Sequence, residues 1–196
     1  MKQIAFFDFD GTITTKDTLL EVIKHKKGKF PFYFGFLLLS PFMVAFKLKL
    51  ISNQTAKEMM LRYFFGKTPI TIFQQDCDAF ASEAIPSLIR PKALKEIEKL
   101  KSIGAEVVIV SASAENWIRK WCESLDIKLI GTKLEVRKEK ITGKIVEKNC
   151  HGEEKVSRIR EAYNLAEYSN IYCYGDTSGD KPMLTLGTVA FYKPFR

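Results

Sequence analysis

From Arg90 to the end of the chain, short apolar runs alternate with segments of helical periodicity. The helical segments lie near Pro91, Trp117 and Val156, and a proline such as Pro91 suits the first turn of a helix. The apolar runs, together with one near the start of the chain, occupy residues 3–7, 105–110, 171–174 and 188–192. Runs of this kind are typical of strands that are buried on both faces. Because strands that alternate with helices are joined by right-handed crossovers, we predict an α/β fold with a doubly wound, mostly parallel sheet.

A long insertion interrupts this alternation after the first strand. A capping box is expected at Thr18-x-x-Glu21, a helical pattern follows Asn53, and a further helix is expected near Pro69, so residues 16–84 look all-helical. The sequence therefore predicts two lobes. Residues 1–15 and 85–196 are expected to form an α/β catalytic core, and residues 16–84 an all-helical cap inserted into it.

Carboxylates cluster at the ends of two predicted strands, which is the edge where open parallel sheets bind ligands. Asp8 and Asp10 follow the first strand, and Asp176 and Asp180 follow the strand at 171–174. Carboxylates brought together at one edge repel one another unless a cation lies between them. Mg²⁺ takes oxygen ligands, usually one or two carboxylates with waters and a substrate phosphate. We therefore predict an Mg²⁺ cofactor held by these four aspartates.

The same edge carries groups suited to phosphoryl transfer. Asp8, at the strand tip, is placed to attack a phosphorus atom and form an acyl phosphate. Asp10 lies on the same side because Phe9 points away, so it can protonate the leaving oxygen and then deprotonate water. The Ser111 hydroxyl and the backbone amides after Asp8 can bind phosphoryl oxygens. Lys155 is expected in the first turn of a helix, where the dipole disfavours a cation unless it faces a phosphate or carboxylates.

In this order, the elements resemble the four motifs of the haloacid dehalogenase superfamily of phosphohydrolases. DFDGT, starting at Asp8, matches the first motif, Ser111 the second, Lys155 the third, and GDTSGD, ending at Asp180, the fourth. The helical insertion resembles the cap of the phosphoserine-phosphatase-like subfamily (subfamily IB). The fourth motif departs from the common pattern at Thr177 and Gly179, and neither change removes a carboxylate.

The resemblance implies a role for each matching residue. Asp8 would be the nucleophile and Asp10 the acid–base residue, and the presence of Asp10 argues against dehalogenation. Asp8, Asp176 and the backbone carbonyl of Asp10 would be metal ligands, with Asp180 in support. The substrate phosphate would be bound by Ser111, Lys155 and the backbone at Gly11 and Ala112.

Several of these features also have a purely structural interpretation. A lone DxDG is a common turn, but its combination with GDxxxD at a later strand end favours a phosphatase site. The GEEK segment that contains Lys155 is often only a solvated start of a helix. Ser113 and Asn116 are expected to cap a helix, and His151 to be a surface residue without a metal role. We also expect a β-hairpin over residues 134–147, with its turn at Thr142-Gly143.

The predicted cap has an unusual composition. Residues 30–46 carry no charge and hold 7 of the chain's 24 aromatic residues (15 Phe, 7 Tyr and 2 Trp). Residues 16–50 contain seven lysines against Asp17 and Glu21, which is five of the net charge of +8. The uncharged run has 17 residues and contains Pro41, so we expect it not to span a membrane, which takes about 20 apolar residues. Two interpretations stay open: the aromatic residues build the cap's own core, or they form an exposed face suited to an anionic bilayer.

The net charge of +8 favours phosphorylated substrates, anionic membranes or other polyanions as partners. The expected partner is a phosphorylated small molecule or a lipid phosphate, with a membrane contact through residues 24–49. The aromatic, basic cap resembles that of subfamily members that act on phosphatidylglycerophosphate, so the resemblance implies this lipid as an example. We expect no nucleic-acid partner, because nothing in the sequence resembles a nucleic-acid-binding fold. The start of the chain has no signal-peptide pattern, so we expect a cytoplasmic location, with peripheral attachment to the inner face of the membrane as an open alternative. Alternatives that stay open are a phosphatase of phosphoserine-like or sugar phosphates, a phosphotransferase, and a non-catalytic membrane-bound module.

Overall fold

The computed structural model describes residues 2–196, and its centre is a five-stranded parallel sheet in the order β3-β2-β1-β6-β7. The strands are β1 (Lys2–Phe7), β2 (Glu106–Ala114), β3 (Lys128–Thr132), β6 (Tyr168–Gly175) and β7 (Val189–Tyr192). The predicted doubly wound parallel sheet is thus confirmed. Strand β3 was not predicted, because this short edge strand is half polar and pairs only with β2.

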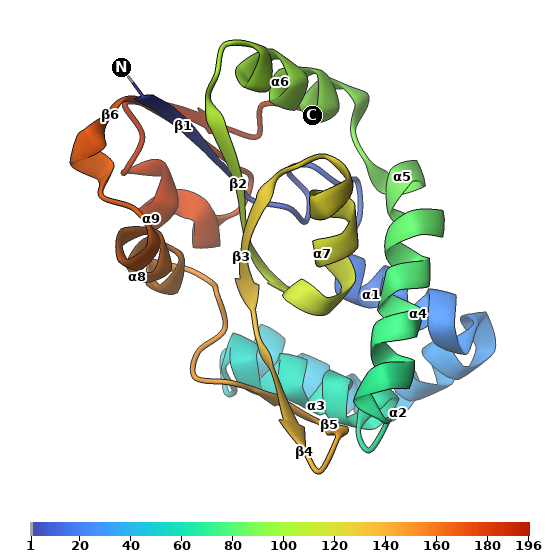
Figure 1. The fold of residues 1–196 in the computed structure, drawn as a ribbon. Coiled ribbons are helices and arrows are strands. Elements are labelled where there is room, and N and C mark those ends of the chain that lie inside the picture. Colours follow the sequence, from blue (N-terminus) through green and yellow to red (C-terminus); the bar gives the residue numbers. More distant parts are fainter. Residues whose placement is uncertain (1) are drawn as a thin grey trace.

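Helices cover both faces of the sheet (Figure 1). Helices α6 (Pro91–Ser102) and α7 (Glu115–Ser124) lie on one face, and α8 (Glu153–Ala162) and α9 (Lys181–Leu184) lie on the other. The period-two alternation of β1 explains this arrangement. Ala5 and Phe7 pack into the core shared with α6 and α7, whereas Ile4 and Phe6 pack into the core shared with α8 and α9. Both faces of β1 are therefore buried, and only its carboxyl end remains for polar chemistry.

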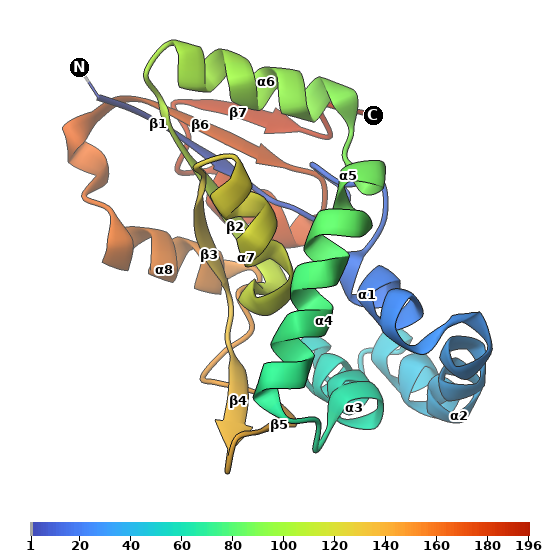
Figure 2. The same ribbon diagram turned by 45° about the vertical axis from the view of Figure 1, so that its right-hand side comes forward.

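Four helices follow β1 and lie together beyond its carboxyl end (Figures 1 and 2). They are α1 (Thr18–Lys27), α2 (Lys29–Lys47), α3 (Asn53–Phe65) and α4 (Ile70–Glu83), which we call the cap helices, and the short α5 (Ile85–Leu88) returns the chain to the core. The expected capping box at Thr18 is wrong. Asp17 is the N-cap, and its side chain accepts a hydrogen bond from the Leu20 N–H at 3.1 Å. Glu21 instead forms an ion pair with Lys24 at 2.7 Å.

A two-stranded hairpin, β4 (Leu134–Arg137) and β5 (Lys140–Ile145), packs against α3. Its turn is Lys138-Glu139, with φ values of 48° and 57°, so the turn expected at Thr142-Gly143 is wrong. Gly143 lies inside β5. A Cβ there would stand 2.4 Å from the Cα of Arg62 in α3, so the glycine serves the close packing of strand on helix.

Candidate active site

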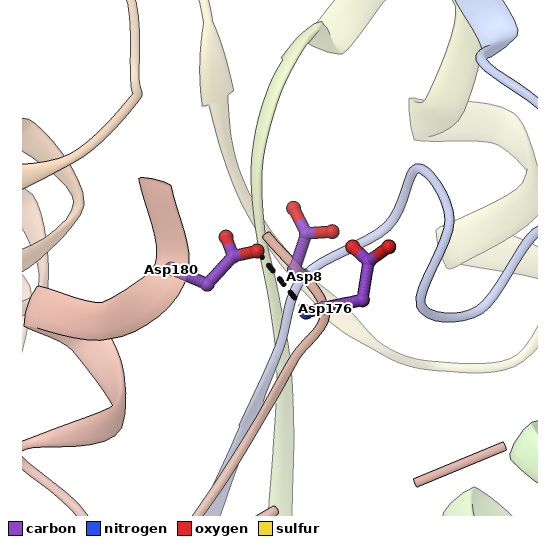
Figure 3. A group of neighbouring side chains, drawn as sticks. All are labelled: Asp8, Asp176 and Asp180. Atoms are coloured by element: carbon purple, nitrogen blue, oxygen red, sulfur yellow. Dashed lines mark hydrogen bonds between the residues drawn. The ribbon is translucent and has the colours of Figure 1, made fainter. Parts of the chain in front are cut away.

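Three buried carboxylates meet at the carboxyl ends of β1 and β6 (Figure 3). Asp8 follows β1 directly, Asp176 follows β6, and Asp180 ends the short 3₁₀ turn Ser178–Asp180. The two strands are parallel neighbours, with Phe7 paired to Tyr174, so their ends lie side by side. Each aspartate offers one oxygen that lies within 4.8 Å of the others. The predicted convergence of the two motifs is therefore found.

Lys155 crosses from the other face of the sheet to join these carboxylates. It lies in the first turn of α8 and its side chain is only 1% exposed. The ammonium donates to Asp8 Oδ1 at 2.6 Å and to Asp180 Oδ1 at 2.8 Å. The alternative that Lys155 belongs to a solvent-exposed start of a helix is therefore wrong. The lysine is buried, and the two carboxylates compensate the cost of removing its charge from water.

Burial and charge act in opposite directions on this cluster. Burial raises the pKa of Asp8 to about 7, although the neighbouring Lys155 ammonium lowers it. Burial alone would lower the pKa of Lys155, but the charges of Asp8 and Asp180 outweigh it and hold that pKa above its ordinary value. The pKa of Asp180 stays below its usual range because Lys155 and the hydrogen bonds from Thr177 outweigh burial. Burial and the Lys155 charge therefore oppose each other at Asp8, and the Lys155 charge prevails at Asp180.

The donor set fits a hard divalent cation. Lys155 pairs with Asp8 and Asp180 but not with Asp176, and the carboxylate atoms that converge are all oxygens, which Mg²⁺ prefers. The Thr12 hydroxyl lies 3.1 Å from Asp8 Oδ2 and 3.2 Å from Asp176 Oδ1, between two of the carboxylates. The guanidinium of Arg196, a half-exposed side chain that no motif singled out, forms an ion pair with Asp176.

Backbone geometry explains why glycines border the site. Gly11 has φ +83°, and a Cβ there would stand 2.6 Å from Asp176 Oδ2, so the turn after Asp8 can approach Asp176 only without a side chain. In the turn after β6, Thr177 donates two hydrogen bonds to Asp180 Oδ2, from its N–H at 2.9 Å and from its hydroxyl at 2.8 Å. The turn that follows β6 therefore holds Asp180 in place over the end of the sheet.

Asp10 faces the cap helices rather than the carboxylate cluster. Its Oδ1 accepts from the Thr18 N–H at 2.7 Å and its Oδ2 accepts from the Ser113 hydroxyl. Burial raises the pKa of Asp10 to about 6, with the charge of Asp17 acting in the same direction. A carboxyl with this pKa can exist in either protonation state near neutral pH, which an acid–base residue requires.

Ser113 and Asn116, which were expected to cap a helix, instead form hydrogen bonds with distant segments. Ser113 belongs to β2 and orients Asp10, whereas Ala114 is the N-cap of α7. Asn116 exchanges hydrogen bonds with Gln74 of α4, donating at 2.9 Å from its amide nitrogen and accepting at 3.0 Å on its backbone carbonyl. Both expectations are wrong because tertiary contacts, rather than the local turn, provide the partners.

The predicted phosphate-binding residues of β2 lie beneath the same region. Ser111 is fully buried, and its hydroxyl accepts from the Ser113 N–H at 3.0 Å. Ala112 lines the cavity described next, and its carbonyl accepts from Thr132 at 2.6 Å and from Lys57 at 2.9 Å. The structure thus places both residues on the strand next to β1, but of the two only Ala112 lines the cavity.

A cavity of about 260 Å³ lies between the end of the sheet and the cap helices. Asp8, Asp10, Ala112, Lys155 and Asp180 line it from the core. From the cap it is lined by Asp17, Leu19, Asn53 and Lys57, and His151 borders it as well. Sequence reasoning singled out no cap residue here and treated His151 as surface only, because the spacing of a motif carries no information about a helix that packs from across the fold.

Lys57 is the most informative of the missed residues. This residue is half-buried, and its ammonium donates to two neutral oxygens, the Ala112 carbonyl at 2.9 Å and Asn149 Oδ1 at 3.1 Å. Among residues 2–196 it forms no ion pair, and burial lowers its pKa. An anion that enters the cavity would meet in Lys57 a second lysine that, unlike Lys155, has no carboxylate partner among the described residues, and it would favour the charged form of that lysine.

Comparisons with known proteins agree with this geometry. A sequence model of haloacid dehalogenase-like hydrolases matches residues 5–185. The chain is 34% identical to Protein CicA of Caulobacter vibrioides over 195 residues, which covers 98% of this chain and 86% of CicA. A protein of unknown function from Bordetella pertussis has the same fold, with a TM-score of 0.84, 19% identity, and coverage of 97% and 89% of the two chains. A phospho-aspartyl intermediate analogue of phosphoserine phosphatase has a TM-score of 0.61 at 19% identity, with coverage of 96% and 85%.

Proposed function

The chain belongs to the haloacid dehalogenase-like hydrolases, and from this premise we propose that it is a phosphomonoester hydrolase that forms an aspartyl phosphate on Asp8. The observation that carries the proposal is the convergence of Asp8, Asp10 and Lys155 on one cavity at the carboxyl end of the sheet. A structural relative described as a phospho-aspartyl intermediate analogue supports the same chemistry.

The reaction divides into two displacements at phosphorus. A carboxylate oxygen of Asp8 attacks the phosphorus, the bond to the ester oxygen breaks, and Asp10 gives its proton to the departing alkoxide. Water then attacks the phosphoryl group, Asp10 takes the proton from that water, and the bond to Asp8 breaks to release inorganic phosphate. The pKa of Asp10, raised to about 6, suits both halves.

The remaining site residues bind the phosphoryl group. Lys155 holds Asp8 Oδ1 and directs its positive charge into the cavity. The Ser111 hydroxyl already accepts from Ser113, so its own proton is available for a phosphoryl oxygen. Backbone N–H groups at Gly11 and Ala112 complete the proposed set, since fixed donors aimed at developing charge stabilise a transition state most effectively.

Mg²⁺ would be held by Asp8, Asp176 and the backbone carbonyl of Asp10, with Asp180 in support. When bound, the ion neutralises charge on the phosphoryl oxygens and offsets the repulsion within the buried carboxylate triad. We also propose that residues 16–84 act as a cap over residues 1–15 and 85–196. The placement of Asn53 and Lys57 in the cavity supports this division.

The substrate class follows less directly from the site. The exposed apolar side chains of α2 favour a lipid phosphate, such as phosphatidylglycerophosphate, as the substrate. A cytoplasmic enzyme would meet this lipid at the inner face of the membrane. A soluble phosphoserine-like or sugar phosphate is the second candidate, because Lys57 and Asp17 offer both signs of charge to a small polar substrate.

The test is phosphate release with Mg²⁺ and with EDTA, over an aryl phosphate, phosphoserine, sugar phosphates and a lysophospholipid phosphate in detergent. Metal-dependent turnover is expected, and the preferred substrate decides between the two classes. Asp8→Asn should abolish turnover, whereas Asp126→Asn, a fully exposed aspartate, should leave it unchanged. Turnover that survives Asp8→Asn would overturn the proposed nucleophile, and a folded, metal-binding protein without turnover would favour the non-catalytic alternative.

A further inference from the structure

Helix α2 exposes a large apolar surface. Six of its side chains, which we call the α2 face, are between 42% and 82% exposed: Phe30, Tyr33, Phe34, Leu37, Leu38 and Phe42. The helix is also long and apolar enough to cross a membrane by length and composition, yet little of it is buried. Contiguous apolar surface of this kind on a folded protein marks an interaction site.

The opposite side of α2 packs into the hydrophobic core and attaches the helix to the rest of the cap. Phe32 and Gly35 are buried, and Phe36, Leu39 and Met43 are partly buried against the same core. These positions follow helical spacing, so they form one stripe that faces α1 and α3. The interpretation that all the aromatic residues build the cap's own core is therefore wrong for the α2 face.

The surroundings of the α2 face are cationic. No Asp or Glu occurs between Glu21 and Glu58. Lys24 and Lys26 are paired with Glu21 and Asp76, but Lys27, Lys29, Lys47 and Lys49 form no ion pair within residues 2–196. Exposed lysines at both ends of an apolar helix face match a surface whose interior is hydrocarbon and whose headgroups are negative.

We propose that the α2 face docks this protein onto an anionic lipid bilayer, with α2 lying in the plane of the interface. The inference deepens the proposed function by naming where a lipid phosphate would be met, and only that link to substrate rests on the proposed function. A second copy of the chain fits the face poorly, because a symmetric pairing brings the two sets of unpaired lysines together. Figure 2 shows α2 at the outer edge of the cap helices, away from the central sheet, where a flat surface can reach it.

A spanning arrangement conflicts with the packing of α2. A Cβ at Gly35 would stand 2.5 Å from the Phe64 ring, so the helix lies directly on α3 along its middle. The Phe32 ring stacks on the Phe64 ring with centroids 6.4 Å apart, and the Phe36 ring lies tilted against it at 4.7 Å. The Lys24 ammonium lies over the Phe32 ring at 4.8 Å. A helix that crossed the bilayer would have to leave these contacts, whereas a helix in the interface keeps them.

Docking is measured without catalysis, by sedimentation of the protein with phosphatidylcholine vesicles that contain or lack phosphatidylglycerol. We expect binding to the anionic vesicles that salt weakens. The triple variant Phe34→Ser, Leu37→Ser, Leu38→Ser and the double variant Lys29→Gln, Lys49→Gln should each weaken it by roughly 10-fold or more. Matched controls lie on or beside α6, at the other end of the molecule: Ile103→Ser, and Lys92→Gln with Lys95→Gln.

Four outcomes would overturn the proposal: no vesicle binding, binding that the α2 variants do not change, association into dimers that the triple variant abolishes, or resistance to alkaline extraction from membranes. Folding of each variant is checked by circular dichroism, and a solvent-facing change should leave the spectrum intact. The assay is repeated with Asp8→Asn. If this variant binds vesicles, docking does not depend on the proposed reaction. If the native protein also lacks phosphatase activity, the proposed reaction fails while docking stands.

Discussion

The cap helices border the cavity on one side and carry the α2 face on the other. The cavity buries charged side chains, whereas the α2 face exposes apolar ones, and both are unusual in a folded protein. At the cavity, three buried carboxylates bring one oxygen each within 4.8 Å of the others, and the buried Lys155 forms ion pairs with two of them, Asp8 and Asp180. On the α2 face, Phe30 is 82% exposed and Leu37 is 69% exposed, with no acidic residue in the sequence around them. Buried charge and exposed aromatic surface are the two observations that most often mark function.

The cavity and the α2 face also differ in what they contribute to the stability of the fold. The cavity side depends on mutual compensation, because removal of one charge leaves the others buried and unpaired. The α2 face contributes little to folding, since its side chains remain in water in the free protein. Substitutions should therefore act on stability and activity at the cavity, and on association alone at α2.

The largest effect is expected for Asp8→Asn. Loss of the nucleophile should lower kcat by roughly 10³-fold or more, because no second carboxylate stands where Asp8 does. The measurement is steady-state phosphate release, with incorporation of labelled phosphate into the acid-denatured protein as a direct probe of the aspartyl phosphate. Labelling of Asp8→Asn at the native level would contradict the assignment.

Lys155→Met should be next in size. Without the ammonium, Asp8 and Asp180 lose their shared ion-pair partner, and the free energy of unfolding should fall by about 3–5 kcal/mol in the absence of divalent metal. Denaturant titration measures this, and Lys92→Met on the exposed face of α6 is the control. Equal stability of the two variants would show that the buried pair is not the structural link that its distances indicate.

Gly11→Ala tests the close approach of the turn to Asp176. The strain of a positive φ and the contact at 2.6 Å from Asp176 Oδ2 should together cost about 1–3 kcal/mol and weaken divalent-metal binding. Gly104→Ala has a similar φ of +78° with no atom within 4 Å of the added Cβ, so it isolates the cost of φ alone. Metal affinity is measured by calorimetry, and identical affinities in the two variants would exclude the clash as the cause.

The smallest effect on stability is expected on the α2 face. Phe34→Ala should change the free energy of unfolding by less than about 0.5 kcal/mol, because its side chain is already half in water. Phe80→Ala, at a fully buried position of α4, should cost about 3–5 kcal/mol. Thermal denaturation of both variants checks the contrast, and comparable losses would mean that the α2 face takes part in folding.

Much of the core could be predicted from local pattern. The apolar runs at residues 3–7 and 171–174 gave β1 and β6, and the polar residues directly after them gave Asp8 and Asp176 at adjacent strand ends. Lys155 was found because a cation in the first turn of a helix is unfavourable without a negative partner. These inferences succeed because strand ends and helix starts have fixed geometry.

Other features depended on contacts between distant segments. The hairpin turn was misplaced because Gly143 resembles a turn residue, whereas its role is to let β5 approach Arg62. Lys57 and Asn53 reach the cavity only because α3 lies across it from the end of the sheet, where Lys57 bonds to Ala112 of β2. Ser113 was assigned to a helix cap because its partner Asp10 lies 103 residues away in the sequence.

The amino-acid sequence by itself determined the parallel sheet, the edge at which its polar residues gather and the chemistry they suit, since each follows from local periodicity and residue type. Only the tertiary structure decided which side of α2 is covered. The stripe through Phe32, Gly35 and Phe36 and the α2 face are almost equally apolar, so hydropathy does not distinguish them. The packing of α2 against α1 and α3 does, because a helix held by one stripe leaves the rest of its circumference exposed.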